Sequence, residues 1–139
     1  MNDLTIAERP VESILILDLK GNIRIGEDSR HIHDTLRQVL ARGEKRILLN
    51  LADVSHIDSS GLGELVAGYA TCRREGADLR LLNLTQRVRE LMVITKLLIV
   101  FDVFDDEQEA IKSFDNAESN NGRASEAATG KLKNTLLDI

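Results

Sequence analysis

The amino-acid sequence predicts a single α/β domain with a mainly parallel central sheet and about four helices. Three observations support this fold class: short apolar segments recur along the chain, segments with helical periodicity separate them, and the connections are only a few residues long. Strands joined by helical crossovers run parallel in one sheet, with helices packed on its faces. A chain of 139 residues, 42% of them hydrophobic, suits one core.

Two strands are expected near the start of the chain. Residues Ser13–Gly21 are apolar at almost every position, which is typical of a central strand buried on both faces. Before them, Leu4–Arg9 fits a short edge strand that Pro10, the only proline, would close. This edge strand would make the sheet mixed at its N-terminal edge.

A helix and a second buried strand come next. From Ser29 the apolar positions adopt helical spacing, and Gly43 follows where the helix should end. The apolar face of this helix is expected to hold Ile32, Leu36, Val39 and Leu40. Residues Arg46–Leu51, RILLNL, predict the second buried strand.

The middle of the chain repeats this order. A helix that stops at Gly76 is expected after the second buried strand, because apolar residues again fall on one face. That face holds Leu62, Leu65, Val66, Tyr69 and Cys72. Residues Leu79–Leu84 predict a third strand, and a helix follows with its inward positions at Val88, Leu91 and Met92.

The last expected elements are a short strand around Val100–Phe104 and a helix that buries Ala110, Ile111 and Phe114. Beyond Phe114 the chain is rich in Asn, Ser, Gly, Ala and Glu without apolar periodicity, which is typical of a flexible segment. We therefore expect a folded domain at residues 1–114 and a polar tail at 115–139. The end of the tail, KLKNTLLDI, fits either a docking helix or a mobile end.

Composition and charge restrict the class of partner. A net charge of -5 disfavours binding to nucleic-acid backbones and anionic membrane surfaces. The longest apolar run, Leu97–Phe101, is far shorter than the roughly 20 residues that span a bilayer, so no membrane insertion is expected. No secretory signal is visible and Cys72 is the only cysteine, so a cytoplasmic protein is expected.

Neither a metal nor a cofactor site is expected. His31 and His33 are two residues apart on a predicted helix and would point in different directions. His56 has no Cys or HExxH pattern near it. Cys72 lies on an apolar helix face, where a buried, inert thiol is favoured over a nucleophile.

The stretch HIDSSGLGEL, residues 56–65, lies where the second buried strand passes into a helix. It lacks the Lys-Ser/Thr pair of a Walker loop, the third glycine of a dinucleotide site and the preceding glycine of a nucleophile elbow. Asp58 or Ser59 could cap the helix. Two helical glycines cost about 1 kcal/mol each relative to alanine. Gly61 and Gly63 therefore indicate a close approach, either by the sheet or by another molecule. A hydroxyl at a helix start is also a favourable place for a phosphate.

With its flanking segments, this motif resembles the STAS domain of the bacterial anti-sigma factor antagonist type. The resemblance runs from about Ser13 to Phe114 and is most specific in the run Asp58-Ser59-Ser60-Gly61-Leu62-Gly63. The segments GADLRLLNL and RVRELMVITKLLIVFDVFDDEQEAI fit as well. The resemblance implies a STAS-like fold and a protein-binding switch, and not an enzyme.

In that family, the unphosphorylated domain binds a GHKL-type serine kinase that is also the anti-sigma factor, and so frees the sigma factor. The kinase phosphorylates the first serine of the motif, and a PP2C-type phosphatase reverses the modification. The resemblance therefore implies phosphorylation of Ser59, with Ser60 less favoured. It also implies a partner-binding surface comprising Asn22, Arg24, Asp58, Ser59, Ser60, Gly61, Leu62 and Gly63.

One segment departs from the family pattern. After Gly21, family members commonly carry acidic residues in a Gly-Glu-Leu-Asp-like run, where this chain has Asn22 and Arg24. Since charge complementarity selects partners, the partner's charge would differ, or the partner would not be the usual kinase. A scaffold or accessory subunit of a larger regulatory or transporter-associated complex is the alternative. A nucleotide- or small-molecule-binding module is a third interpretation.

Overall fold

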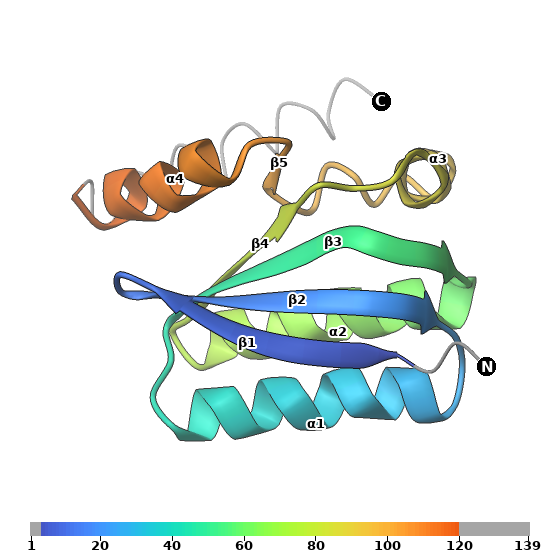
Figure 1. The fold of residues 1–139 in the computed structure, drawn as a ribbon, viewed down its shortest axis with the longest axis horizontal. Helices are drawn as coiled ribbons and strands as arrows, with labels where there is room; N and C mark the ends of the chain where they lie inside the picture. Colours follow the sequence, from blue (N-terminus) through green and yellow to red (C-terminus); the bar gives the residue numbers. More distant parts are fainter. Residues whose placement is uncertain (1–3, 120–139) are drawn as a thin grey trace.

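In the computed structural model, which describes residues 4–119, five strands form one sheet in the order β1-β2-β3-β4-β5 (Figure 1). β1 runs antiparallel to β2, and the other neighbouring pairs are parallel. The strands are β1 Thr5–Val11, β2 Ile14–Ile23, β3 Arg46–Ile57, β4 Asp78–Leu82 and β5 Val103–Phe104. The prediction of a mainly parallel sheet, mixed at its N-terminal edge, is confirmed.

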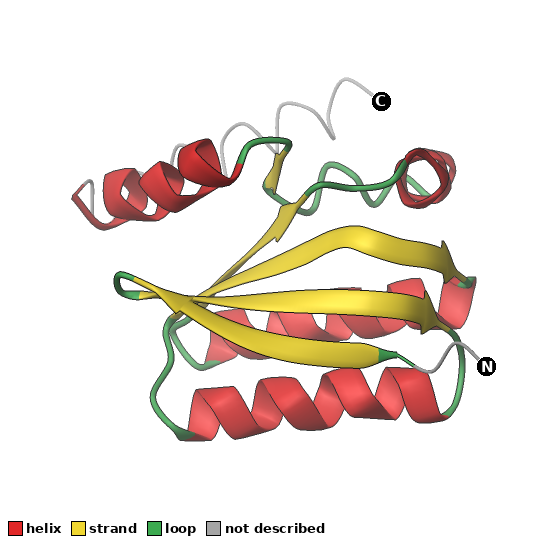
Figure 2. Cartoon of the chain, in the orientation of Figure 1, coloured by secondary structure: helices red, strands yellow, loops and turns green. Residues whose placement is uncertain are grey.

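Within the described residues, one helix follows each strand from β2 to β5. These helices are α1 Glu27–Ala41, α2 Ser59–Arg74, α3 Gln86–Ile94 and α4 Glu107–Ser119. α1 and α2 lie side by side on one face of the sheet, whereas α4 lies on the other face (Figures 1 and 2). The predicted α/β architecture with about four helices is therefore confirmed.

The central strands are buried on both faces, as their continuous apolar sequence predicts. Successive side chains of a strand point to opposite faces, so adjacent residues enter different cores. Leu17 of β2 packs with α1 and α2 in the larger core, whereas its neighbour Ile16 packs beneath α4 with Leu48 and Phe114. Cys72 is fully buried in the larger core, and this burial raises the pKa of its thiol to about 11.

Several strand boundaries in the first half of the chain differ from the prediction, and β2 ends at Ile23 and not at Gly21. Pro10 does not close β1: it pairs in register with Leu15, and β1 continues to Val11. An edge strand tolerates proline because one side of its backbone has no strand partner. β3 extends to Ile57 and not to Leu51, because its pairing with β2 continues after its pairing with β4 ends at Asn50.

The second half of the chain shows similar differences. β4 ends at Leu82, before Asn83, which adopts a left-handed backbone conformation with φ 58°. β5 is reduced to Val103–Phe104. α4 buries Ala110, Ile111 and Phe114 as predicted, but it continues to Ser119 into the segment expected to be tail. The KLKNTLLDI segment lies outside the described residues. No helix in the described part of the chain is long and apolar enough to span a membrane.

Candidate functional site

The two serines of the motif lie at the start of α2, at the edge of the sheet where β2 and β3 end (Figure 1). Ser59 is the first residue of the helix, and both Ser59 and Ser60 are exposed. Among the described residues, neither serine hydroxyl has a hydrogen-bond partner within the protein. Both hydroxyls are therefore available to solvent or to another molecule.

Asp58 is the residue that caps α2. Its backbone is extended, its Oδ1 accepts a hydrogen bond from the Gly61 N–H at 2.7 Å, and its carbonyl accepts one from the Leu62 N–H at 2.9 Å. The Gly61 N–H and the Ile25 N–H stabilise the ionised carboxylate and lower the pKa of Asp58, although partial burial acts in the opposite direction. Because Asp58 performs the capping, the Ser59 side chain has no structural role at the helix terminus.

Asp58 also binds the loop between β2 and α1, residues 24–26. Its Oδ2 accepts a hydrogen bond from the Ile25 N–H at 3.1 Å, and its own N–H donates to the Ile23 carbonyl at 3.2 Å. On the other side of the loop, Asp28 Oδ2 accepts from the Arg24 N–H at 3.1 Å. Two carboxylates therefore hold the loop beside the start of α2.

The two motif glycines have opposite surroundings. A Cβ atom on Gly61 would overlap the carbonyl oxygen and the side chain of Ile23, so the close approach of β2 requires glycine there. A Cβ atom on Gly63 would meet no atom within 4 Å, and Gly63 is exposed. Packing against the sheet therefore explains Gly61 but not Gly63.

The remaining residues of the expected partner surface are unequally accessible. Leu62 is part of the larger core, with 1% of its surface exposed. Asn22 lies within β2 and is 8% exposed, so its side chain is barely accessible in this conformation. Arg24 is about half exposed, and its Nε lies 3.7 Å from Asp28 Oδ2. The charge of Arg24 is therefore partly neutralised within the domain.

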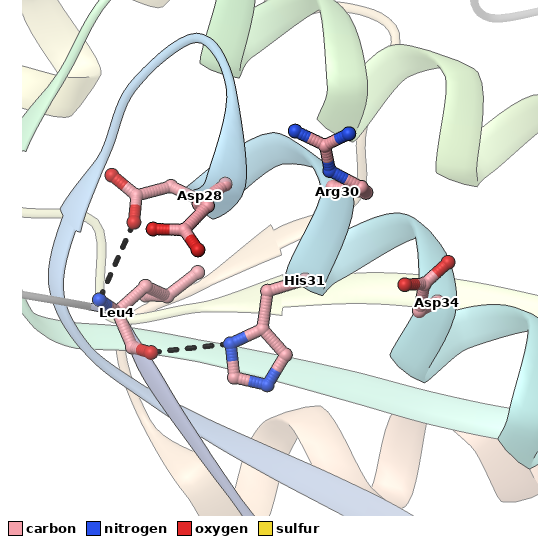
Figure 3. A pocket seen from close by; sticks show the side chains of 6 residues that line it. Leu4, Asp28, Arg30, His31 and Asp34 are labelled. Atoms are coloured by element: carbon pink, nitrogen blue, oxygen red, sulfur yellow. Dashed lines mark hydrogen bonds between the residues drawn. The ribbon is translucent and has the colours of Figure 1, made fainter.

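The start of α1 carries a shallow, open depression of about 380 Å³ beside Leu4. Figure 3 shows Asp28 and His31 on either side of the Leu4 backbone: Asp28 Oδ1 accepts from the Leu4 N–H at 3.4 Å, and His31 Nδ1 donates to the Leu4 carbonyl at 3.1 Å. These contacts attach the residue before β1 to α1. His33 points elsewhere, with its Nδ1 3.4 Å from Glu64 Oε1 on α2. The prediction that these two histidines diverge is confirmed.

Two residues of the site were not among the sequence candidates. Ile25 is 74% exposed at the loop tip, and Asp28 fixes the loop from the first turn of α1. An isoleucine between Arg24 and Gly26, outside any predicted strand or helix, was the available signal for an exposed apolar side chain. For Asp28 the signal was weaker, because an acidic residue in the first helical turn is common.

Residues 6–110 match the STAS domain family. The anti-sigma-B factor antagonist of Bacillus subtilis (strain 168) is 40% identical over 89 residues, which cover 62% of this chain and 81% of that protein. The anti-sigma F factor antagonist of Paenibacillus polymyxa is 24% identical over 103 residues, which cover 70% of this chain and 84% of that protein.

Among solved structures, the fold is similar to that of the Bacillus cell fate determinant SpoIIAA in its phosphorylated form. The TM-score is 0.62 and the sequence identity is 19%, over 79% of this chain and 99% of the other. At this level of identity the likeness shows a shared fold.

Proposed function

The chain belongs to the STAS domain family, and we propose that it is an anti-sigma factor antagonist controlled by phosphorylation of Ser59. In its unphosphorylated form it binds an anti-sigma factor that is also a GHKL-type serine kinase, and so frees a sigma factor. The kinase ends the interaction by phosphorylating Ser59, and a PP2C-type phosphatase restores binding. The chain itself acts as a binding protein and not as an enzyme.

The observation that supports this proposal most strongly is the division of roles between Asp58 and Ser59. Asp58 caps α2, so the exposed Ser59 hydroxyl is unused by the fold at the first helical position. A phosphate at a helix start is stabilised by the helix dipole and adds a charge of about -1.5 to -2. The free domain would tolerate this charge, whereas a partner surface fitted to the neutral hydroxyl would reject it.

The exposed Gly63 is consistent with this function. Residues i and i+4 of a helix share one face, so Gly63 lies one turn below Ser59. The space above Gly63 is open in the free domain, and the fold provides no reason for a glycine there. We propose that a kinase reaching the Ser59 hydroxyl uses this clearance to approach the helix backbone.

Affinity purification of the tagged full chain from its native cells, followed by phosphosite mass spectrometry, tests the partner and the site together. We expect an anti-sigma factor kinase to co-purify and phosphate to be found on Ser59. With purified components, Ser59→Asp should weaken kinase binding and Ser59→Ala should abolish phosphorylation, while the matched variant Ser60→Ala retains most of it. Phosphate transfer that survives in Ser59→Ala would contradict the assignment.

A scaffold or accessory subunit of a larger complex is the second candidate. Val93 and Ile94 on α3 are 54% and 77% exposed, so the domain has apolar surface outside the motif. Large exposed apolar side chains can mark protein contacts. Light scattering that finds a stable, large assembly whose size is indifferent to Ser59 phosphorylation would favour this alternative.

A further inference from the structure

Ile25 is one of three large apolar residues that are exposed on the described part of this domain. Among the described residues, the most exposed large apolar side chains are Ile25 at 74%, Ile94 at 77% and Val93 at 54%. Burying a side chain of this size releases about 1.5–3 kcal/mol, which the free domain does not gain from Ile25. Of the three, Ile25 alone lies in the loop that Asp58 ties to the start of α2.

The backbone of this loop is fixed on both sides of Ile25. Asp58 holds the Ile25 N–H, Asp28 holds the Arg24 N–H, and the Arg24 carbonyl accepts from the Ser29 N–H at 3.2 Å and the Ser29 hydroxyl at 3.1 Å. Gly26 follows with φ 102°, a conformation that other residues rarely adopt. Ile25 is therefore presented on an ordered backbone, which lowers the entropic cost of using it in an interface.

Arg24, the charged residue of this loop, is paired with Asp28, and Asn22 at the end of β2 is buried. A shallow, open depression of about 410 Å³ beside the loop is lined by Arg24, Ile25, Glu27, Asp28 and Asp58, so one large apolar side chain shares it with charged residues. This arrangement is similar to an interface in which an apolar anchor is enclosed by a polar rim.

We propose that Ile25 is the apolar anchor with which this domain recognises its anti-sigma factor, and that Asp58 is a positioning residue that holds Ile25 beside Ser59. The inference rests on the proposed function and specifies its recognition chemistry: the partner offers an apolar pocket to the loop, and ion pairing is secondary. One carboxylate, that of Asp58, thus contacts both the helix start that carries Ser59 and the loop that carries the anchor.

The test measures the affinity of the unphosphorylated full chain for the purified anti-sigma factor kinase obtained by the co-purification above. We expect Ile25→Ser to weaken binding by at least about tenfold, as the loss of a buried hydrophobic anchor would. Ile25→Met, which keeps an apolar side chain, should stay within about threefold of the wild type. Ile94→Ser is the matched control, since it removes an equally exposed side chain from α3, and it should bind like the wild type.

Each outcome separates this inference from the function on which it rests. If Ile25→Ser binds as tightly as the wild type, or if Ile94→Ser weakens binding as much as Ile25→Ser does, the anchor role of Ile25 is wrong. The proposed antagonist function then still stands. A wild-type chain that binds no anti-sigma factor overturns both. Unchanged melting temperatures of the Ile25 and Ile94 variants are expected, because their side chains are largely exposed.

The positioning role of Asp58 is tested in the free protein. Asn caps helices about as well as Asp, but it has a single acceptor oxygen in place of two. Asp58→Asn should therefore preserve α2 while it accelerates amide hydrogen exchange at Ile25 and weakens kinase binding. An Ile25 amide that exchanges at the wild-type rate in Asp58→Asn would overturn the positioning role, whatever the binding result.

Discussion

At the scale of single residues, the motif combines a glycine required by the fold with a glycine that the fold does not require. Gly61 lies against Ile23, the last residue of β2, and any side chain at position 61 would overlap the Ile23 backbone carbonyl. Gly63 faces open space in the second turn of α2. A glycine that weakens an exposed helix without a packing reason is more readily explained by a contact made outside the domain.

This contrast predicts opposite effects of the same substitution. Gly61→Ala should destabilise the domain by about 1–3 kcal/mol, because the backbone of Ile23 must move. Gly63→Ala should stabilise it by about 0.5–1 kcal/mol, because alanine favours the helix and restricts the unfolded chain. Denaturant unfolding of both variants measures the difference. A destabilised Gly63→Ala would show that this glycine serves the fold and is not a clearance for the kinase.

Residue chemistry could be predicted from the sequence only in part. The pattern Asp-Ser-Ser-Gly indicated a helix start with a cap and an available hydroxyl, and the capping role falls to Asp58. Accessibility could not be predicted in the same way. Asn22 is polar yet buried within β2, and Ile25 is apolar yet exposed. Both outcomes depend on where β2 ends and on loop contacts to residues distant in sequence.

At the scale of elements, a polar network joins the edge strand β1 to β2 and α4. The Arg9 guanidinium donates to Asp18 Oδ2 at 2.8 Å and Oδ1 at 3.1 Å, and to Glu107 Oε1 at 2.8 Å and Oε2 at 3.0 Å. Asn50 of β3 adds a hydrogen bond to Asp18 at 2.8 Å. Hydrogen bonds from Arg9 lower the pKa of both carboxyl groups, and partial burial opposes this effect.

The network should make stability depend on acid pH. Because both carboxyl pKa values are lower in the folded state, their stabilisation is fully present above about pH 4–4.5 and is lost as the pH falls through the folded pKa values. Arg9→Met should cost about 1 kcal/mol at pH 7, a small value because Arg9 is 39% exposed and solvent screens the ion pairs. The difference from wild type should shrink toward pH 2.

Thermal unfolding across pH 2–7 measures this dependence. Arg42→Met is the matched control, because Arg42 pairs with Glu8 of β1 at the exposed surface, and its effect should be smaller than that of Arg9→Met. A difference between wild type and Arg9→Met that stays constant down to pH 2 would contradict the assigned role of the two carboxylates.

Element types were more predictable than their lengths. The order of strands and helices followed from apolar runs and helical spacing, which report local burial. The end of β3 does not follow from apolar runs, because Ala52, Asp53 and Ser55 are exposed although the strand remains paired with β2. Pro10 does not terminate β1, because β1 is an edge strand that pairs with β2 on one side only and so tolerates a residue without an N–H donor. Such boundaries depend on strand pairing, which is not encoded locally.

At the scale of the whole molecule, the parallel order of β2, β3 and β4 brings the ends of these strands to one edge of the sheet. The loop that presents Ile25 and the helix start that presents Ser59 meet there. The hydrogen bond between Ile25 and Asp58 joins these two segments across a sequence separation of 33 residues. α4 lies over the smaller core on the other face of the sheet (Figure 2). The proposed phosphorylation switch therefore lies apart from the core that α4 covers.

This arrangement predicts how truncation affects the domain. We propose that the folded unit ends with α4, at Ser119, and that residues 120–139 are not needed for folding. A chain of residues 1–119 should keep the melting temperature within about 2 °C of the full chain and should bind the same partner. A chain of residues 1–114 should melt about 3–6 °C lower, because it loses the ion pair between Arg46 and Asp115 and the last turn of α4 beside the buried Phe114. Calorimetry of the three chains measures both effects.

A marked loss of stability in the 1–119 chain would show that the folding unit extends beyond Ser119. Equal melting temperatures of the 1–114 and 1–119 chains would show that the folding unit ends at Phe114.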